Sequence, residues 1–532
     1  MKQLKNILII GLVGMFSLTS CLKDLDTVPL DEDVNSPDVI YSTQQGYLQV
    51  LAKIYAGFAV TGQDGPAGDP DIAGIDEGFS SYLRQYWNLQ ELPTDEAING
   101  WNDDGIPSLN FMTWSSTNPF VRALYYRIYY QITLANEFIR ESSDSKLDSR
   151  GFSNEQKAII REYRAEARFL RAISYWHALD LFTDSPFITE DNPIGAFLPL
   201  PITRENLFTY IEGELLEIED LIKPARTNEY GRADQAAVWA LLAKLYLNAE
   251  VYTGVAYNTE CITYCKKIFE AGYSLTTDYS HLFLADNDRS AVADEAIFSI
   301  IFDGLFTQTY GGTTFLVHAA VGGNMSVVDY GIDYGWGGNR VTKNLVNLFD
   351  DITGDSDSRA MFHTDGQTIE ITDIADFTYG YAVTKFKNIT SDGDPGSHQT
   401  FVDNDFHMFR LPDFYLMYAE AFLRGGLGGD QATALGYINE MRQRAYGDNS
   451  GNVSIAQMDL DFILDERARE LYWECHRRTD LIRFNKFTSG TYVWPWKGGV
   501  SNGIGVDDKY NVFPLPASDV VANPNLVKTP GY

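Results

Sequence analysis

The chain has 532 residues, of which 73 are Asp or Glu and 41 are Lys or Arg, so its formal net charge at pH 7 is −32. A protein of this charge repels nucleic acid and anionic lipid headgroups, which argues against both as direct partners and favours a neutral or cationic ligand. The length allows a substantial buried core in one large domain or several. Aromatic residues make up 14% of the chain, more than a core alone requires, so we expect some rings at the surface.

The N-terminus has the pattern of a processing signal. Lys2 and Lys5 form a basic start, and residues 7–18 are apolar but too few for a spanning helix of about 20 residues. Leu18-Thr19-Ser20-Cys21 then resembles the cleavage site of a bacterial lipoprotein. We therefore predict a signal peptide over residues 1–20 and lipidation of Cys21, which would anchor the mature protein without spanning the membrane. The alternative is an ordinary secretory peptide with an incidental cysteine.

Downstream of Cys21, residues 21–40 are acidic and contain proline, which predicts a tether, and residues 41–532 are expected to form a single domain. Apolar periodicity and helix-ending signals predict a helical frame over about 119–271 and 406–484. Their lengths and short polar turns suggest antiparallel helical hairpins like those of tetratricopeptide arrays. Helices are predicted over 44–59, 119–142, 162–186, 204–221, 233–249, 259–271, 412–423, 431–446 and 454–484.

The helix predicted over 162–186 carries the clearest local signals. Ser153 and Gln156, three residues apart, form a capping box ahead of it, and Pro186 is expected to end it. Apolar side chains fall into two stripes, so neighbours are needed on two sides. Three arginines share one face and require acids from other elements. The stripes are Ile160, Tyr163, Ala167, Leu170, Leu181 and Phe169, Ile173, Trp176, Leu179; the arginines are Arg164, Arg168 and Arg171.

Two aromatic-rich segments interrupt this frame, at about 60–117 and 294–405. Within the first, residues 78–114 show no sustained helical period. The second has glycine clusters and short alternating pieces such as 380–387, which predict loops with a little strand. The predicted class is therefore mainly α, with two irregular insertions and a little β.

Six segments distributed over the chain carry a family resemblance. They match in order, which is hard to attribute to chance, and they resemble the SusD/RagB family of surface glycan-binding lipoproteins of Bacteroidetes. The segments are EYRAEARFLRAISYWHALDLFTDSP from Glu162, GRADQAAVWALLAKLYLNAEVYTG from Gly231, RLPDFYLMYAEAF from Arg410, LDERARELYWECHRRTDLIRF from Leu464, WKGG from Trp496 and FPLPASDVVANPNLVKTPGY from Phe513.

This resemblance implies a SusD-like fold, a site on the outer-membrane surface and a role in capturing oligosaccharides for a TonB-dependent transporter of the SusC type. Three further motifs resemble starch-binding members in particular: DEG at 76–78, ELPTDE at 91–96 and YGGTTFLV at 310–317. The expected ligand is thus an α-glucan, starch or malto-oligosaccharide, bound without catalysis.

A glycan site needs aromatic faces for the apolar side of sugar rings, and polar groups for their hydroxyls. By resemblance, the sugar-contacting positions are Asp76, Arg84, Trp101, Tyr310 and Trp336. The chain departs from the starch-binding pattern at Asn99-Gly100-Trp101, where one stacking ring is missing, and the polar partner is either Asp103 or Asp104. A β-1,3-glucan such as laminarin, or another neutral glycan, therefore stays open as the ligand.

Other chemistries have weaker signals. Two acidic loops hold oxygen ligands of the kind that calcium prefers, although plain solvated turns explain them better. No cofactor is expected otherwise. A glycoside hydrolase is the remaining alternative, but no pair of carboxylates is marked out for it, and no nucleophile elbow or phosphate loop is present in the sequence. We therefore expect a binding protein rather than an enzyme. The calcium candidates are Asp286, Asp288, Asp403 and Asp405.

Overall fold

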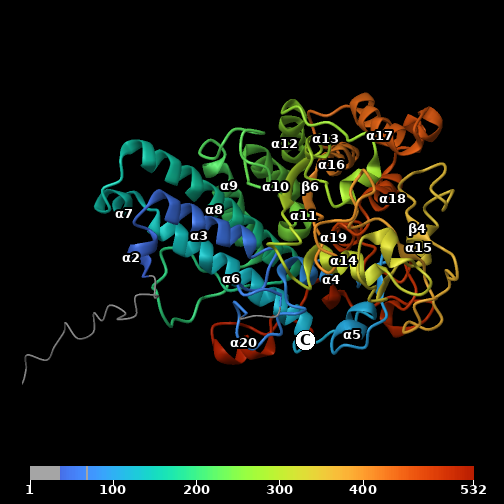
Figure 1. Ribbon diagram of the computed structural model, residues 1–532, viewed down its shortest axis with the longest axis horizontal. Coiled ribbons are helices and arrows are strands. Elements are labelled where there is room, and N and C mark those ends of the chain that lie inside the picture. Colours follow the sequence, from blue (N-terminus) through green and yellow to red (C-terminus); the bar gives the residue numbers. More distant parts are fainter. Residues whose placement is uncertain (1–35, 67–69) are drawn as a thin grey trace, which may run out of the picture. The chain divides into compact units, whose positions relative to one another are not determined.

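The computed structural model describes residues 36–66 and 70–532 (Figure 1). The described residues divide into two compact units, with the boundary between Gln49 and Val50. The predicted signal peptide, the lipidation site Cys21 and most of the predicted tether lie outside the described residues. Within the described ranges, no helix combines the length and the hydropathy that crossing a membrane requires.

The helix α8, Asn154–Leu181, confirms the strongest local prediction. The Ser153 side chain accepts from the Gln156 backbone N–H, and the Gln156 side chain accepts from the Ser153 backbone N–H, so the capping box is formed. The helix ends before Pro186, however, because Phe182 already has an extended backbone. Both predicted apolar stripes are buried, so α8 has neighbours on two sides.

Acids from other elements compensate the arginine face of α8, as predicted. Arg168 pairs with Glu214 of α9 (2.7 Å), and Arg171 pairs with the same carboxylate through its other oxygen (2.6 Å). Arg164 lies 3.3 Å from Asp144. Because the Arg171 side chain is 1% exposed, losing its carboxylates would leave a charge buried without a partner, which is strongly destabilising.

A frame of paired helices fills the second unit. Successive helices pack as neighbours: α6 on α8, α8 on α9, α10 on α12, α12 on α16 and α16 on α17 (Figure 1). The predicted helical-hairpin frame is confirmed. The frame helices are α6 Pro119–Glu141, α8, α9 Arg204–Ile218, α10 Gln235–Leu247, α12 Asn258–Glu270, α16 Leu411–Leu423, α17 Gln431–Tyr446 and α18 Leu460–Leu471.

Shorter helices connect these elements. The helix α2 precedes α3, which crosses the boundary between the two units, begins at the predicted residue and ends three residues early. The others lie in or between the insertions and the frame. They are α2 Pro37–Ile40, α3 Gln44–Ala56, α4 Tyr82–Glu91, α5 Ile106–Asn110, α7 Asp144–Ser149, α11 Ala249–Thr253, α13 Ser290–Ala293, α14 Gly312–Ala320, α15 Lys343–Val346, α19 Arg477–Arg483 and α20 Ala517–Ala522.

Two helix predictions were wrong. Residues 78–114 contain α4, which the sequence did not predict because it is only ten residues long and lies between irregular segments; its polar residues Gln85, Asn88, Gln90 and Glu91 are buried together with the apolar ones. The helix predicted over 454–484 is broken into α18 and α19, since Trp473 and Cys475 adopt left-handed backbone conformations. The Trp473 carbonyl accepts from Trp87 Nε1 (3.1 Å) and its indole donates to the Glu96 carbonyl (3.1 Å), which fixes the break.

The loop-rich segment 294–405 contributes to three small antiparallel sheets, as its glycine clusters and short alternating pieces predict. The pairs are β1 Ile98–Asn99 with β3 Asn339–Arg340, β2 Ala296–Ile300 with β6 Phe406–Arg410, and β4 Phe362–His363 with β5 Ala382–Val383. The strand predicted over 380–387 is only two residues long. The pairing of β1 with β3 matters most, because it joins the first insertion to the second.

Candidate functional site

Three aromatic rings from the two insertions meet at one place. The register of β1 on β3 sets Asn99 opposite Asn339, and Gly100 N donates to the Gly338 carbonyl (3.0 Å). The loops that flank these strands therefore bring Trp101 and Trp336 together, with ring centroids 6.3 Å apart and planes inclined by 45°. Tyr310, just before α14, lies 6.5 Å from Trp336 at 53°. All three rings are partly exposed, and we call them the aromatic platform.

Hydrogen bonds between loop residues hold the platform rings in place. Trp101 Nε1 donates to the Trp336 carbonyl (3.3 Å), and Trp101 N donates to Asn99 Oδ1 (2.8 Å). Asn99 is buried, and its amide donates to Asn339 Oδ1 (2.6 Å), so the position where the sequence lacks a stacking ring ties β1 to β3. A Cβ at Gly338 would lie 2.5 Å from the Trp101 ring. A glycine is therefore required there for Trp101 to take its place.

Arg84 of α4 joins the two loops behind these rings. Its Nη1 donates to the carbonyls of Gly78 (3.0 Å) and Tyr310 (3.2 Å), and its Cζ lies 5.7 Å from the Trp101 ring centroid. Burial lowers the pKa of Arg84 to about 10, against the opposing charges of Asp103 and Asp76, so the guanidinium stays charged at neutral pH. Its Nη2 forms no hydrogen bond with the described residues, which leaves a donor for a ligand.

The three predicted aspartates are exposed and differ in their surroundings. Asp76 Oδ1 accepts from Gly78 N (2.8 Å), which shapes the turn before α4. Neither Asp103 nor Asp104 accepts a hydrogen bond from any described residue through its carboxylate. Of these two, Asp103 is the one whose charge acts on Arg84. Asp103 is therefore the polar neighbour of the platform. Both Asp103 and Asp104 also line the polar pocket described below.

Two residues that the sequence did not single out complete the platform. His318 of α14 stacks on Trp336, with ring centroids 4.8 Å apart and planes inclined by 28°. Burial lowers the pKa of His318, and since its Nδ1 lies 2.7 Å from the Tyr334 carbonyl, a pure acceptor, Nδ1 carries the hydrogen. Phe315, one turn earlier, lies under both Trp101 (5.9 Å) and the Arg84 guanidinium (4.5 Å). The i, i+3 spacing on α14 was the only sequence signal for this pair.

The two insertions hold further aromatic and polar residues, most of which lie away from the platform. Tyr82, Tyr86 and Trp87 of α4 are at most 2% exposed and belong to the core. Tyr334 is 51% exposed, and its ring lies 5.7 Å from that of His318, so it extends the platform at one edge. Asn324 is engaged with Asp365 (2.7 Å) rather than with the platform.

The two acidic loops lie side by side, but their carboxylates brace backbone. Asn287 and Asp405 exchange hydrogen bonds between the loops (2.9 and 3.0 Å). Asp403 accepts from Gly304 N (2.7 Å) and Asp286 from Ser391 N (2.8 Å). Asp405 accepts from Phe302 N (2.7 Å). Among the residues that the structure describes, no three His, Cys, Asp or Glu side chains gather as metal ligands.

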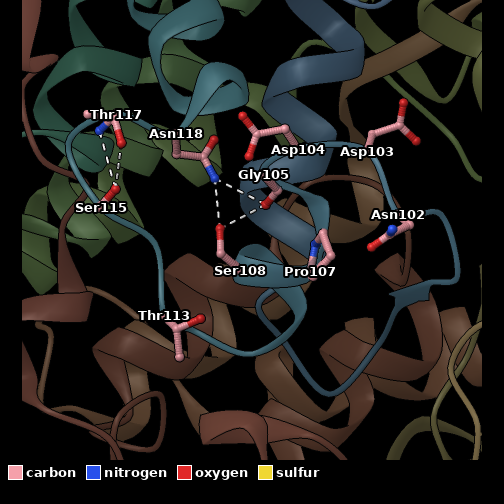
Figure 2. A pocket seen from close by; sticks show the side chains of 10 residues that line it. All are labelled: Asn102, Asp103, Asp104, Gly105, Pro107, Ser108, Thr113, Ser115, Thr117 and Asn118. Atoms are coloured by element: carbon pink, nitrogen blue, oxygen red, sulfur yellow. Dashed lines mark hydrogen bonds between the residues drawn. The ribbon is translucent and has the colours of Figure 1, made fainter.

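A polar pocket of about 510 Å³ begins at Asn102, the residue that follows Trp101 in the chain (Figure 2). Residues 102–108 form one wall and residues 113–118 the other. Asn118 Nδ2 donates to the Gly105 carbonyl (3.1 Å) and to Ser108 Oγ (2.9 Å), which joins the walls. On the far wall, the hydroxyls of Ser115 and Thr117 lie 2.9 Å apart. Both walls therefore present fixed oxygen atoms to the space between them.

Comparison with known proteins decides the family. The SusD family model matches residues 365–532. Over its whole length the chain is 36% identical to the starch-binding protein SusD of Bacteroides thetaiotaomicron, of which the alignment covers 99%. The chain belongs to the SusD family. The resemblance drawn from the sequence motifs is confirmed, and so is the expectation of a non-catalytic protein, since SusD-family proteins are binding proteins and not enzymes.

Solved structures confirm the SusD-like fold of this SusD-family protein. A SusD superfamily protein from Parabacteroides distasonis has a TM-score of 0.71 at 21% identity, covering 92% of this chain and 99% of its own. Surface glycan-binding protein A from Bacteroides thetaiotaomicron, solved in complex with laminarihexaose, has a TM-score of 0.68 at 19% identity, covering 91% and 99%. At these identities the likeness establishes the fold alone. The mainly α prediction is thus confirmed.

Proposed function

We propose that this SusD-family protein captures a neutral glycan at the cell surface, most favourably an α-glucan of the starch type, and passes it to a SusC-type TonB-dependent transporter without cleaving it. The observation that carries this proposal is the aromatic platform of Trp101, Tyr310 and Trp336, with Arg84 and Asp103 beside it. Stacking faces with polar neighbours are what sugar rings require.

The inclination of the rings favours a curved chain. A flat polysaccharide ribbon would be matched by coplanar rings, whereas the planes here are inclined by 45° and 53°. An α-1,4-glucan turns as it extends, so successive sugar units present their apolar faces at different angles. The starch-binding SusD to which the chain is 36% identical supports the same ligand class.

A β-1,3-glucan is the second candidate. The missing stacking ring at Asn99-Gly100-Trp101 keeps it open, and two solved proteins of this fold bind such chains: the laminarihexaose complex named above and a laminarin-binding SusD-like protein with a TM-score of 0.67. Such a chain also curves. The charge of −32 and the acids around the platform argue against anionic glycans in either class.

Affinity is expected to be modest. A few rings on an open face typically give dissociation constants in the micromolar to millimolar range, or about −8 to −4 kcal/mol. Weak binding suits a protein that must release its cargo to a transporter. Lipidation at Cys21 would hold the protein at the outer membrane, where SusD-family proteins are found, and the helical frame would provide the surface that meets the transporter.

Calorimetric titration tests the proposal. Protein that starts at residue 22 is titrated with maltoheptaose and, separately, with laminarihexaose, and each mixture is examined for shorter products after overnight incubation. We expect maltoheptaose to bind and to remain intact. Binding of laminarihexaose alone would move the ligand to the second class. Shorter products, or no binding of either saccharide, would contradict the proposed role.

A further inference from the structure

The polar pocket between residues 102–108 and 113–118 differs in kind from the aromatic platform (Figure 2). None of its lining residues is aromatic, so no sugar ring can stack there. Its volume of about 510 Å³ falls within the range of about 300–1,000 Å³ that small-molecule sites occupy. It begins at Asn102, the residue that follows Trp101. Asp103, which lines the pocket, also acts through its charge on Arg84 behind the platform rings, so the pocket and the platform have a residue in common.

The walls of this pocket are fixed before any ligand arrives. Gly105 has a φ of 104°, and a Cβ there would lie 2.8 Å from the Phe120 ring, so the wall turns at a point where a side chain would clash. Asn118 Oδ1 accepts from Phe120 N (2.9 Å) and caps α6, while its Nδ2 binds Ser108 and Gly105. A preorganised wall costs little entropy when a ligand binds.

Two carboxylates that line this pocket, those of Asp103 and Asp104, accept no hydrogen bond from the described residues. By contrast, Asp76, Asp286 and Asp403 each accept backbone N–H groups. A carboxylate offers two oxygens that accept hydrogen bonds from neighbouring hydroxyls. Sugar hydroxyls are such donors, and the hydroxyls of Ser115 and Thr117 complement them on the opposite wall.

We propose that this pocket is a subsite for the terminal unit of a neutral glycan, reached by a branch or chain end whose main chain lies on the aromatic platform. This rests on the proposed glycan-binding function and adds a selection rule to it. The platform contributes stacking, which depends little on the ends of the chain. The pocket contributes hydrogen bonds to one unit, and its two carboxylates repel a terminal unit that carries a carboxylate or sulfate.

The first test separates the pocket from the platform by ligand length. Titrations compare maltotriose, which covers the platform only, with maltoheptaose, which also reaches the pocket; the laminari-oligosaccharides of the same lengths replace them if that class binds. The variant Ser115→Leu/Thr117→Leu fills the pocket and removes two hydroxyls without adding a ring. Both positions are exposed, so the fold is expected to survive. The control is Ser145→Leu/Thr263→Leu, at exposed positions on α7 and α12.

Wild-type protein should bind the longer saccharide about tenfold more tightly, the value of one or two good hydrogen bonds. In Ser115→Leu/Thr117→Leu this advantage should fall to about twofold or less, with maltotriose binding unchanged and the control variant unaffected. A length advantage that persists, or an equal loss for both saccharides, would overturn the pocket assignment. Failure of wild-type protein to bind any of these saccharides would instead overturn the proposed function.

The second test concerns charge. Maltoheptaose with its terminal unit oxidised to a C6 carboxylate should bind wild-type protein about tenfold more weakly than maltoheptaose, since two carboxylates then face a third. In Asp104→Asn, which leaves Asp103 beside the platform in place, the difference between the two ligands should shrink to about threefold. An oxidised ligand that binds wild-type protein as well as its neutral parent would overturn the selection rule.

Discussion

Replacing Trp336 by Ala should abolish measurable glycan binding while leaving the protein folded. Trp336 is the only platform ring within 6.5 Å of both others. Fully burying an aromatic side chain contributes about 1.5–3 kcal/mol, and a sugar covers one face, so the direct loss is about 1–1.5 kcal/mol. Loosening of the neighbouring rings should bring the total to about 2–3 kcal/mol, or roughly thirty- to a hundredfold in affinity. A ligand with a dissociation constant of about 30 µM would then bind with a constant of about 1 mM or weaker, where calorimetry no longer detects binding.

The fold should tolerate this change. Trp336 is partly exposed, and the hydrogen bonds at its backbone, to the His318 carbonyl (2.7 Å) and from Trp101 Nε1, remain in the variant. We expect a stability loss of about 1–2 kcal/mol, against a typical total of 5–15 kcal/mol. Trp239→Ala is the matched control, since this partly exposed indole on α10 bonds Glu219 (2.7 Å) and lies outside the site. Undiminished affinity in folded Trp336→Ala would refute the site.

Further predictions address the supports of the site and the frame. Arg84→Gln should weaken glycan binding about tenfold. Because the pKa of Arg84 is about 10, the affinity of the wild-type protein should stay level between pH 6 and 9. Calorimetric titration at several pH values tests this, and a fall in affinity within that range would contradict it. Gly338→Ala should displace Trp101, because the added Cβ would lie 2.5 Å from its ring. The tryptophan fluorescence should change and glycan binding should weaken. Unchanged fluorescence and unchanged affinity would contradict the packing argument. Two arginines, Arg483 among them, hold the pKa of buried Glu420 down to about 2, so about 3 kcal/mol of stability present above pH 4.5 should be lost as the pH falls towards 2. Denaturant unfolding at pH 7 and at pH 3 measures this loss, and the free energy of unfolding should fall less between these pH values in Glu420→Gln than in the wild-type protein.

The sequence predicted the elements whose signals are local. The box at Ser153 and Gln156 marks the start of α8, and periodic apolar stripes mark its buried faces. By contrast, α4 escaped prediction because it is only ten residues long and its polar residues, which are buried in the fold, look in the sequence like those of an exposed loop. The break between α18 and α19 escaped as well, since Trp473 and Cys475 take left-handed conformations without a glycine or proline to announce them.

The site likewise has parts that the sequence predicts and parts that it does not. Motifs named Trp101 and Trp336, but the two-residue pairing of β1 with β3 that joins them across 235 positions has no sequence signal of its own. A lone histidine such as His318 carries no signal in the sequence, and only its stacking on Trp336 in the structure shows what it supports. The pocket lined by Asp104 depends on two loops that Asn118 joins by hydrogen bonds. The sequence shows these loops only as an irregular segment.

The most direct test of the central claim is a crystal structure of the protein with maltoheptaose. The aromatic platform predicts that the saccharide curves over the rings of Trp101, Tyr310 and Trp336, with Arg84 and Asp103 hydrogen-bonded to its hydroxyls. A saccharide bound on another surface, with these three rings uncovered, would contradict it.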